Sequence, residues 1–231
     1  MNKFSIIIPV YNEQENVQIL FEEIYLFLKK ISDFEVVFVN DASTDNTLQN
    51  LKEIKSKNKN VIIINNEKNL GQSMSIIRGV KKANSKIIIT LDGDCQNDPN
   101  DIIKLYDKYI SDSDLKLVAG IRENRKDNVI KIISSIIANK IRNFFLNDNC
   151  TDTGCGLKVF DKEIFLSFFE FDGIHRFLPA LFNGFGYKVF FIPVNHRPRV
   201  YGFSKYDTLK RAIKGINDIF LVKKIIKNRK K

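Results

Sequence analysis

The sequence contains no tryptophan, two histidines and three cysteines, and this scarcity excludes several kinds of site. Cys95, Cys150 and Cys155 form an odd set without a CxxC spacing for zinc, which favours a reducing compartment. His175 and His196 are too far apart to match the ligand spacing of zinc sites. We therefore interpret the cysteines as small buried residues and expect no zinc.

Long apolar runs are also lacking. No run approaches the roughly eighteen residues that a spanning helix needs, and the first apolar run, residues 4–9, is too short for a signal peptide. We therefore expect a cytoplasmic protein, or one peripheral at the inner face of a membrane. The 231 residues contain no internal repeat and no linker, so they predict a single α/β domain.

The net charge of +10 is confined to one end of the chain. Residues 197–231 contain twelve Lys or Arg and two acids, whereas the preceding residues contain equal numbers of each sign. Apolar residues recur there at helical spacing, at Leu209, Ala212, Ile213, Ile216 and Phe220. A basic amphipathic helix favours contact with an anionic membrane surface; an ordinary packed terminal helix is the alternative.

Hydrophobic periodicity predicts alternating strands and helices, and hence a mostly parallel sheet. The predicted strands are residues 4–9, 35–39, 61–64, 86–91, 117–120, 154–160 and 188–193. The predicted helices are residues 15–30, 45–57, 72–83, 100–110 and 129–145, with Ser43 or Thr44 near the N-cap of the second. Helical segments containing the phenylalanine-rich stretch 165–171 separate the last two strands, and we expect these phenylalanines in the core.

Two carboxylates follow the strand at residues 86–91. Asp92 and Asp94 are separated by one glycine and lie where open α/β sheets bind ligands. Hard oxygen ligands there suit Mg²⁺ or Mn²⁺ holding a diphosphate. A polar Asp-Gly turn explains these residues equally well when they are taken alone.

The loops after the first two strands are polar as well. Tyr11 and Glu13 follow the first strand, and Asp41 follows the second. In a parallel sheet these loops meet at the edge that carries Asp92 and Asp94. An aromatic ring and carboxylates at that edge suit a base and a ribose.

These motifs together resemble the family 2 glycosyltransferases with the GT-A fold. The matching residues are Pro9-Val10-Tyr11-Asn12-Glu13, Asn40-Asp41-Ala42-Ser43, Asn69-Leu70-Gly71 and Asp92-Gly93-Asp94. The continuation to Gln96 and Asp98-Pro99 is similar to the dolichol-phosphate mannose synthase and polyprenyl-phosphate glycosyltransferase branch. That branch transfers a sugar from a nucleotide-diphosphate sugar to a polyprenyl phosphate.

The resemblance implies roles for residues in the first half. Metal and diphosphate would lie at Asp92, Asp94 and Gln96, with Mg²⁺ or Mn²⁺ as the cofactor. The nucleotide would lie at Pro9, Tyr11, Glu13, Asp41 and Asp92. We expect residues 1–99 to form a nucleotide-sugar half, 100–206 an acceptor half and 207–231 a basic amphipathic tail.

The second half extends the resemblance through basic residues. Gly120-Ile121-Arg122, Lys131 and the stretch Arg199 to Lys205 match the branch, although an arginine is usual where Lys131 stands. Lysine keeps the charge but loses the fork that grips phosphate. The implied catalytic residues are Asp94, Arg122, Lys131, Arg199 and Lys205. The segments around Gly154 and His175 resemble a bacterial subgroup.

The predicted reaction is a metal-dependent, inverting sugar transfer from a GDP- or UDP-sugar to a polyprenyl or dolichyl phosphate. The first alternative is a non-processive transfer to a sugar hydroxyl, with Asp152 as general base. Processive synthases use a Gln-x-x-Arg-Trp segment, which a chain without tryptophan cannot contain. The second alternative is a non-catalytic module whose basic end binds nucleic acid or lipid; we expect no nucleic-acid partner, and a homo-oligomer stays open.

Overall fold

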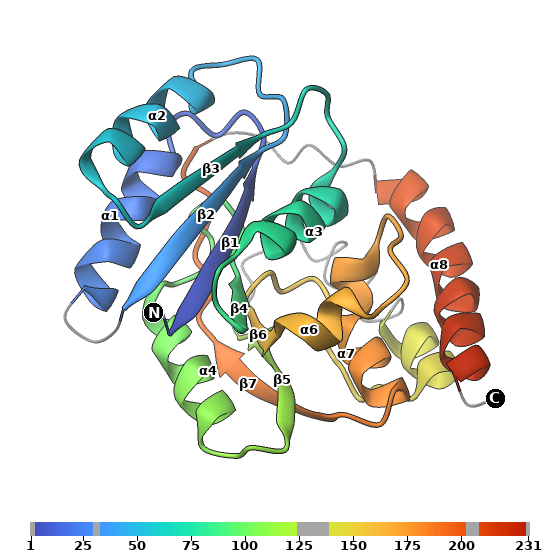
Figure 1. The fold of residues 1–231 in the computed structure, drawn as a ribbon. Helices are drawn as coiled ribbons and strands as arrows, with labels where there is room; N and C mark the ends of the chain where they lie inside the picture. Colours follow the sequence, from blue (N-terminus) through green and yellow to red (C-terminus); the bar gives the residue numbers. More distant parts are fainter. Residues whose placement is uncertain (1–2, 30–32, 124–138, 202–207, 230–231) are drawn as a thin grey trace.

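The computed structural model describes residues 3–29, 33–123, 139–201 and 208–229 (Figure 1). The first half contains β1 (Phe4–Val10), α1 (Val17–Leu28), β2 (Phe34–Asn40), α2 (Thr47–Lys57), β3 (Val61–Asn65), α3 (Gln72–Lys82), β4 (Ile87–Thr90) and α4 (Asn100–Ile110). The second half contains β5 (Leu115–Arg122), β6 (Lys158–Asp161), α6 (Lys162–Leu166), α7 (Ile174–Gly184), β7 (Lys188–Val194) and α8 (Thr208–Arg229).

The described strands form one seven-stranded sheet in the order β3-β2-β1-β4-β6-β5-β7. β1 pairs in parallel with both β2 and β4, β2 pairs in parallel with β3, and β5 pairs in parallel with β7. Only β6 runs antiparallel to its neighbours in this sheet, β4 and β5. The predicted α/β fold with a mostly parallel sheet is therefore confirmed.

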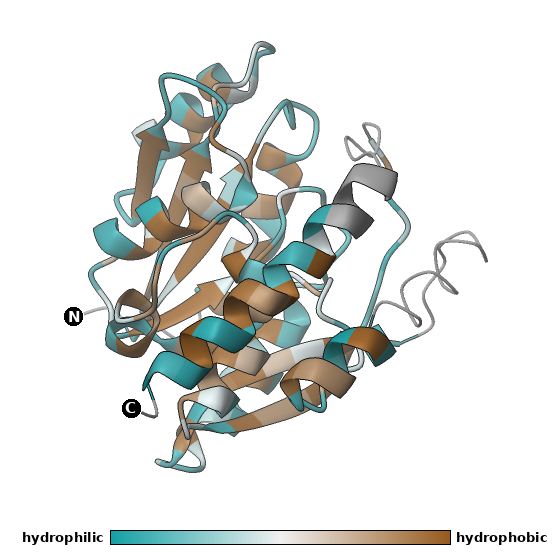
Figure 2. Ribbon diagram, turned by 90° about the vertical axis from the view of Figure 1, so that its right-hand side faces the viewer, coloured by the Kyte–Doolittle hydropathy of each residue, from teal (hydrophilic) through white to brown (hydrophobic). Residues whose placement is uncertain are grey.

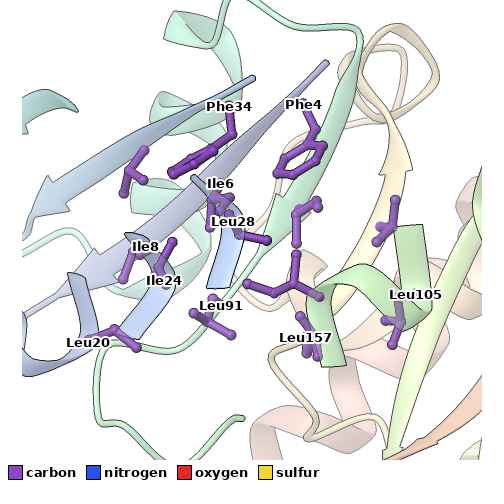
Figure 3. Close-up of a cluster of buried hydrophobic side chains, with 14 of the residues drawn as sticks. Phe4, Ile6, Ile8, Leu20, Ile24, Leu28, Phe34, Leu91, Leu105 and Leu157 are labelled. Carbon is purple, nitrogen blue, oxygen red and sulfur yellow. The ribbon is translucent and has the colours of Figure 1, made fainter. Parts of the chain in front are cut away.

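Alternate residues of the central strands enter two cores, one on each face of the sheet. Phe4, Ile6 and Ile8 of β1 pack with α1, α2 and α4 (Figure 3). Ile7 between them packs with α3, α6, α7 and α8 on the other face. Because both faces are covered, β2 is buried along its whole length and is nearly continuous in apolar residues.

The sequence predicted most element boundaries closely, and α4 matches its predicted range of 100–110. The N-cap prediction for α2 was wrong, because Asn46 occupies that position. Ser43 instead accepts from the Asn12 backbone N–H at 2.9 Å. The strand predicted over 154–160 begins only at Lys158, and of the helix predicted over 129–145 the described part, from residue 139, is helical.

α8 is both a packed helix and an exposed one. Ile219 and Val222 are buried in the core beside α7, whereas Ile216 and Phe220 are 51% and 55% exposed. Brown and teal bands alternate along this helix in Figure 2. Three of the four phenylalanines predicted for the core, Phe165, Phe168 and Phe171, are buried, and Phe169 is exposed.

Candidate active site

The loops after β1, β2 and β4 meet at the carboxyl edge of the sheet. Asn12 joins the first two, since its side-chain oxygen accepts from the Thr44 backbone N–H at 2.8 Å. Asn12, Ala42 and Cys95 lie one in each loop, and each has a φ between 52° and 59°. Left-handed backbone is costly for residues other than glycine and is concentrated at functional sites.

Asp92 follows β4, and two residues that are distant in the sequence, Gln72 and Gly156, lie against its carboxylate. Gln72, the first residue of α3, donates from Nε2 to Asp92 Oδ1 at 2.8 Å. Gly156 faces the same carboxylate closely enough that a Cβ would lie 2.2 Å from Asp92 Oδ2. Burial, followed by the charge of Asp94, raises the pKa of Asp92 to about 6. A cation beside Asp92 would relieve both effects.

Asp94 is paired with Arg199 in this structure. Arg199 Nη2 donates to Asp94 Oδ2, and Arg199 Nη1 lies 3.6 Å from Glu13 Oε1. The structure therefore brings together Glu13 of the predicted nucleotide site, Asp94 of the predicted metal site and Arg199 of the predicted acceptor loop. These residues are up to 186 positions apart in the sequence, and no periodicity indicates that they touch.

The segment that carries Arg199 is held against the loop that carries Asp94. Arg197 N donates to Gln96 O at 2.8 Å, and Gln96 Nε2 donates back to Arg197 O at 3.3 Å. The Arg197 guanidinium pairs with Glu23 and Asp98, both at 2.8 Å. Gln96 thus contacts Asp94, whose Oδ1 accepts from the Gln96 backbone N–H at 3.2 Å, and its amide nitrogen is engaged by the basic segment.

Arg122 lies at the end of β5 and is clamped by Asp152. Arg122 Nε and Nη2 donate to the two Asp152 oxygens at 2.7 and 2.8 Å, and the Arg122 backbone N–H donates to Oδ2 at 3.1 Å. The Asp152 side chain is 5% exposed. Both of its oxygens are therefore occupied by an arginine, which fits an orienting role better than that of a general base.

The predicted nucleotide residues differ in their surroundings. Asp41 is buried and accepts from the backbone N–H groups of Leu70 and Gly71, each at 2.8 Å, so it also holds the loop before α3. Tyr11 and Pro9 are partly exposed at the end of β1. Among the predicted catalytic residues, Lys131 and Lys205 lie outside the described part of the chain.

Three residues beside Asp92 were not predicted: Gln72, Gly156 and Lys158. Lys158 is 3% exposed, donates to the Cys155 carbonyl oxygen, and its charge lowers the pKa of Asp92 against the larger effects of burial and Asp94. Gln72 directly follows the Asn69-Leu70-Gly71 motif, which is the one signal that could have identified it. Gly156 and Lys158 lie in the segment around Gly154 that resembles a bacterial subgroup, but the resemblance assigned them no role.

The carboxylates fit a metal that shares its coordination with a ligand. The described residues contain no group of three or more His, Cys, Asp or Glu side chains placed to hold a metal by themselves. Mg²⁺ commonly takes one or two carboxylates and completes its shell with phosphate oxygens and water. Asp92 and Asp94 supply such a pair, and the charge of Arg199 on Asp94 shows that this position attracts a cation.

The three cysteines contribute no thiolate to the site. Burial raises the pKa of Cys95 and Cys155 to about 12 and that of Cys150 to about 11. Thiols of such pKa stay protonated at neutral pH and are poor metal ligands. The interpretation as small buried residues is confirmed for Cys150 and Cys155, whereas Cys95 is only partly buried.

Comparison with known proteins identifies the family. The model of "Glycosyl transferase family 2" matches residues 5–169, which include Asp92, Asp94, Arg122 and Asp152. The chain belongs to glycosyl transferase family 2. Within this family 2 chain, α8 and the basic segment around Arg199 lie beyond the matched residues.

Similar sequences include undecaprenyl-phosphate 4-deoxy-4-formamido-L-arabinose transferases. The protein from Pectobacterium atrosepticum is 33% identical over 208 residues, covering 89% of this chain and 63% of the relative. The protein from Proteus mirabilis is 32% identical over 212 residues, covering 91% of this chain and 64% of the relative. The chain thus spans just under two thirds of the length of these relatives.

Solved structures share the fold at low sequence identity. Glucosyl-3-phosphoglycerate synthase from Mycobacterium tuberculosis, in complex with Mn²⁺, UDP and glucosyl-3-phosphoglycerate, is 14% identical with a TM-score of 0.73, covering 96% of this chain and 80% of its own. A mannosyltransferase from Pyrobaculum calidifontis, in complex with GDP-Man and Mn²⁺, is 17% identical with a TM-score of 0.68. The match covers 95% of this chain and 63% of the mannosyltransferase chain. The predicted GT-A fold is confirmed.

No helix within the described residues combines the length and the hydropathy needed to cross a membrane.

Proposed function

We propose that this family 2 chain forms the catalytic part of a metal-dependent, inverting glycosyltransferase. The donor is a nucleotide-diphosphate sugar with GDP or UDP, and the acceptor is a polyprenyl phosphate at a membrane surface. Residues 1–99 bind the donor, 100–206 the acceptor, and 207–231 the membrane. The observation that carries this proposal is the meeting of Asp92 and Asp94 with the cations Arg122, Lys158 and Arg199 at one sheet edge.

Carboxylates and basic side chains meet at this edge of the sheet. That combination suits a site that binds both a donor diphosphate and an acceptor phosphate better than a site that binds the donor alone. A donor diphosphate alone needs a metal on carboxylates, whereas a phosphate nucleophile needs fixed cations close to that diphosphate. The charges of Arg122, Lys158 and Arg199 all act on Asp92. The names of the relatives, which specify undecaprenyl phosphate, support the same class of acceptor.

In the proposed reaction, an acceptor phosphate oxygen forms a bond to the anomeric carbon while the bond from that carbon to the diphosphate breaks. The electron pair of the breaking bond leaves with the nucleoside diphosphate, and one displacement inverts the anomeric centre. A phosphomonoester with a second pKa of about 6 is largely ionised at neutral pH, so no proton must be removed. The site therefore works through orientation and charge.

Different residues of the site are proposed to hold the metal, the acceptor phosphate and the nucleotide. Asp92 and Asp94, with Gln96 as a third oxygen ligand, would hold Mg²⁺ or Mn²⁺, which when bound neutralises charge on the departing diphosphate. Arg122, kept in place by Asp152, and Arg199 attract the acceptor phosphate, together with Lys131 and Lys205. Pro9, Tyr11, Glu13 and Asp41 line the nucleotide side. The engagement of Asp152 by Arg122 favours a phosphate acceptor over a sugar hydroxyl, which would need a base.

Helix α8 is the part of the chain proposed to contact the membrane surface. Ile216 and Phe220 are exposed on a helix that also presents the side chains of Lys223 and Lys224. Exposed apolar residues among lysines suit the interface of an anionic bilayer. The location is therefore proposed to be the cytoplasmic face of a membrane.

The test is release of nucleoside diphosphate from UDP- and GDP-sugars, with Mn²⁺ or Mg²⁺ and with or without a polyprenyl phosphate. We expect release that requires both metal and acceptor, and loss of release in Asp94→Asn with the fold retained by circular dichroism. Release that proceeds fully in Asp94→Asn would remove the proposed metal role. No turnover of any nucleotide sugar under these conditions would contradict the proposed function.

A further inference from the structure

Arg199 makes one contact that the proposed metal would also need. Its Nη2 donates to Asp94 Oδ2, while Asp94 Oδ1 accepts from the Gln96 backbone N–H at 3.2 Å, so both oxygens of this proposed metal ligand are engaged. Its Nη1 is buried and has no hydrogen-bond acceptor within the described residues, because Glu13 Oε1 at 3.6 Å is too far. A buried guanidinium N–H without an acceptor is costly and indicates a ligand position.

Two cations cannot both use the same carboxylate oxygen at full strength. Arginine stays charged at every physiological pH, so it cannot yield Asp94 to a metal by losing a proton. Its side chain must change partner instead. The two hydrogen bonds between Arg197 and Gln96 hold the segment in place, so this change needs only the side chain of Arg199.

We infer that Arg199 and the divalent cation exchange at Asp94, and that this exchange prepares the acceptor-phosphate site. In this structure, Arg199 neutralises Asp94. With a metal on Asp94, the guanidinium would keep only its longer contact with Glu13, at 3.6 Å, and Nη2 would join Nη1, which has no hydrogen-bond acceptor among the described residues, as a donor for a phosphate oxygen. This inference rests on the proposed function and adds to it a link between the metal and the acceptor phosphate through one side chain, Arg199.

The exchange makes the two substrates interdependent. If metal releases Arg199 for phosphate, metal must raise the affinity for the acceptor, and the acceptor must raise the affinity for metal by the same factor. A chain in which Arg199 only neutralised surface charge would show no such dependence.

Arg197 provides a matched control. It stands two residues away in the same segment and carries the same charge, but it pairs with Glu23 and Asp98 and not with Asp94. Arg199→Gln and Arg197→Gln therefore change the net charge and the long-range field equally. Only Arg199→Gln removes the competitor at Asp94.

The first experiment measures Mn²⁺ binding from the free-ion EPR signal, in parallel series with UDP and with GDP. We expect Arg199→Gln to bind Mn²⁺ more tightly than the unmodified chain, by about fivefold for a partly exposed ion pair. We expect Arg197→Gln to bind as the unmodified chain does. Equal affinities of the unmodified chain and Arg199→Gln, or an equal gain in both variants, would overturn the exchange.

The second experiment uses citronellyl phosphate as a short acceptor and measures its affinity with and without Mn²⁺ and nucleotide. In the unmodified chain, Mn²⁺ should raise this affinity, and in Arg199→Gln the increase should vanish. If Mn²⁺ still raises the acceptor affinity of Arg199→Gln, the exchange is contradicted but the proposed function is not. If the unmodified chain binds no Mn²⁺ with either nucleotide, the proposed metal-dependent function fails, and the exchange fails with it.

Discussion

Gly156 and Asp92, 64 residues apart in the sequence, lie so close that a Cβ on Gly156 would be within 2.5 Å of both Asp92 carboxylate oxygens. A glycine at this point lets the chain before β6 pass directly beside the end of β4. Thr90 fixes the same approach by donating from its hydroxyl to the Gly156 carbonyl oxygen at 2.6 Å. The position of Asp92 therefore depends on a residue in the other half of the chain.

Gly156→Ala should displace the Asp92 carboxylate, because the added methyl group cannot fit beside it. We expect loss of the stabilisation that Mn²⁺ and nucleotide give in a thermal-shift assay, and a loss of about 1–3 kcal/mol in the free energy of unfolding. Gly215→Ala is the control, since a Cβ at Gly215 meets nothing within 4 Å and alanine favours a helix. Retained ligand stabilisation in Gly156→Ala would contradict the proposed place of Asp92.

Asp92 should destabilise the metal-free chain at neutral pH. Its folded-state pKa of about 6 is above that of an unfolded aspartate, so the folded chain binds more protons between about pH 4 and 6. Stability from this group is thus greatest at low pH and falls as the pH rises through 6. Because the group is partly exposed, we expect a cost of about 1–2 kcal/mol.

Asp92→Asn should remove that cost, because the amide oxygen of the introduced asparagine can still accept from Gln72. In urea unfolding without metal, the variant should be more stable than the unmodified chain at pH 7.5, and the difference should shrink towards pH 4.5. Comparing the two proteins at each pH cancels the other titrating groups. A variant that is less stable at pH 7.5 would show that the ionised carboxylate is favourable in the fold.

The sequence predicted the strands, most helices and the edge of the sheet at which the carboxylates lie. These features follow from local periodicity, as in α4, and from the rule that ligands bind at the carboxyl ends of parallel strands. The sequence did not predict Gln72, Gly156 and Lys158 beside Asp92, because contacts across the sheet depend on strand order. It placed Arg199 with the acceptor but not on Asp94, since ion pairing between distant loops leaves no local pattern.

Asp152 should act by holding Arg122 and not by taking a proton. Asp152→Asn keeps one oxygen but loses the charge, so we expect a loss of about 3 kcal/mol in stability from leaving Arg122 without its partner. Turnover should fall mainly through a higher KM for the acceptor. The pH profile of kcat separates the roles, because removal of a general base would abolish kcat and its acidic limb.

α8 should bind anionic vesicles through its exposed apolar residues. The double variant Ile216→Ser and Phe220→Ser should lose most co-sedimentation with phosphatidylglycerol vesicles, since both side chains are about half exposed. Phe220 also contacts the ring of Phe145, so retention of the fold is checked by circular dichroism. Ile110→Ser changes a residue of the same exposure, 54%, at the end of α4 and is the control. Equal loss in the control, or none in the double variant, would contradict the assignment of this face.

Mass spectrometry of the lipid product tests the proposed sugar transfer most directly. The chain is incubated with a polyprenyl phosphate, Mn²⁺ and each of a set of UDP- and GDP-sugars, with Asp94→Asn in parallel. We expect a polyprenyl-phosphate sugar from at least one donor and none from the variant. Sugar found only on a carbohydrate hydroxyl, or only as free sugar, would contradict it.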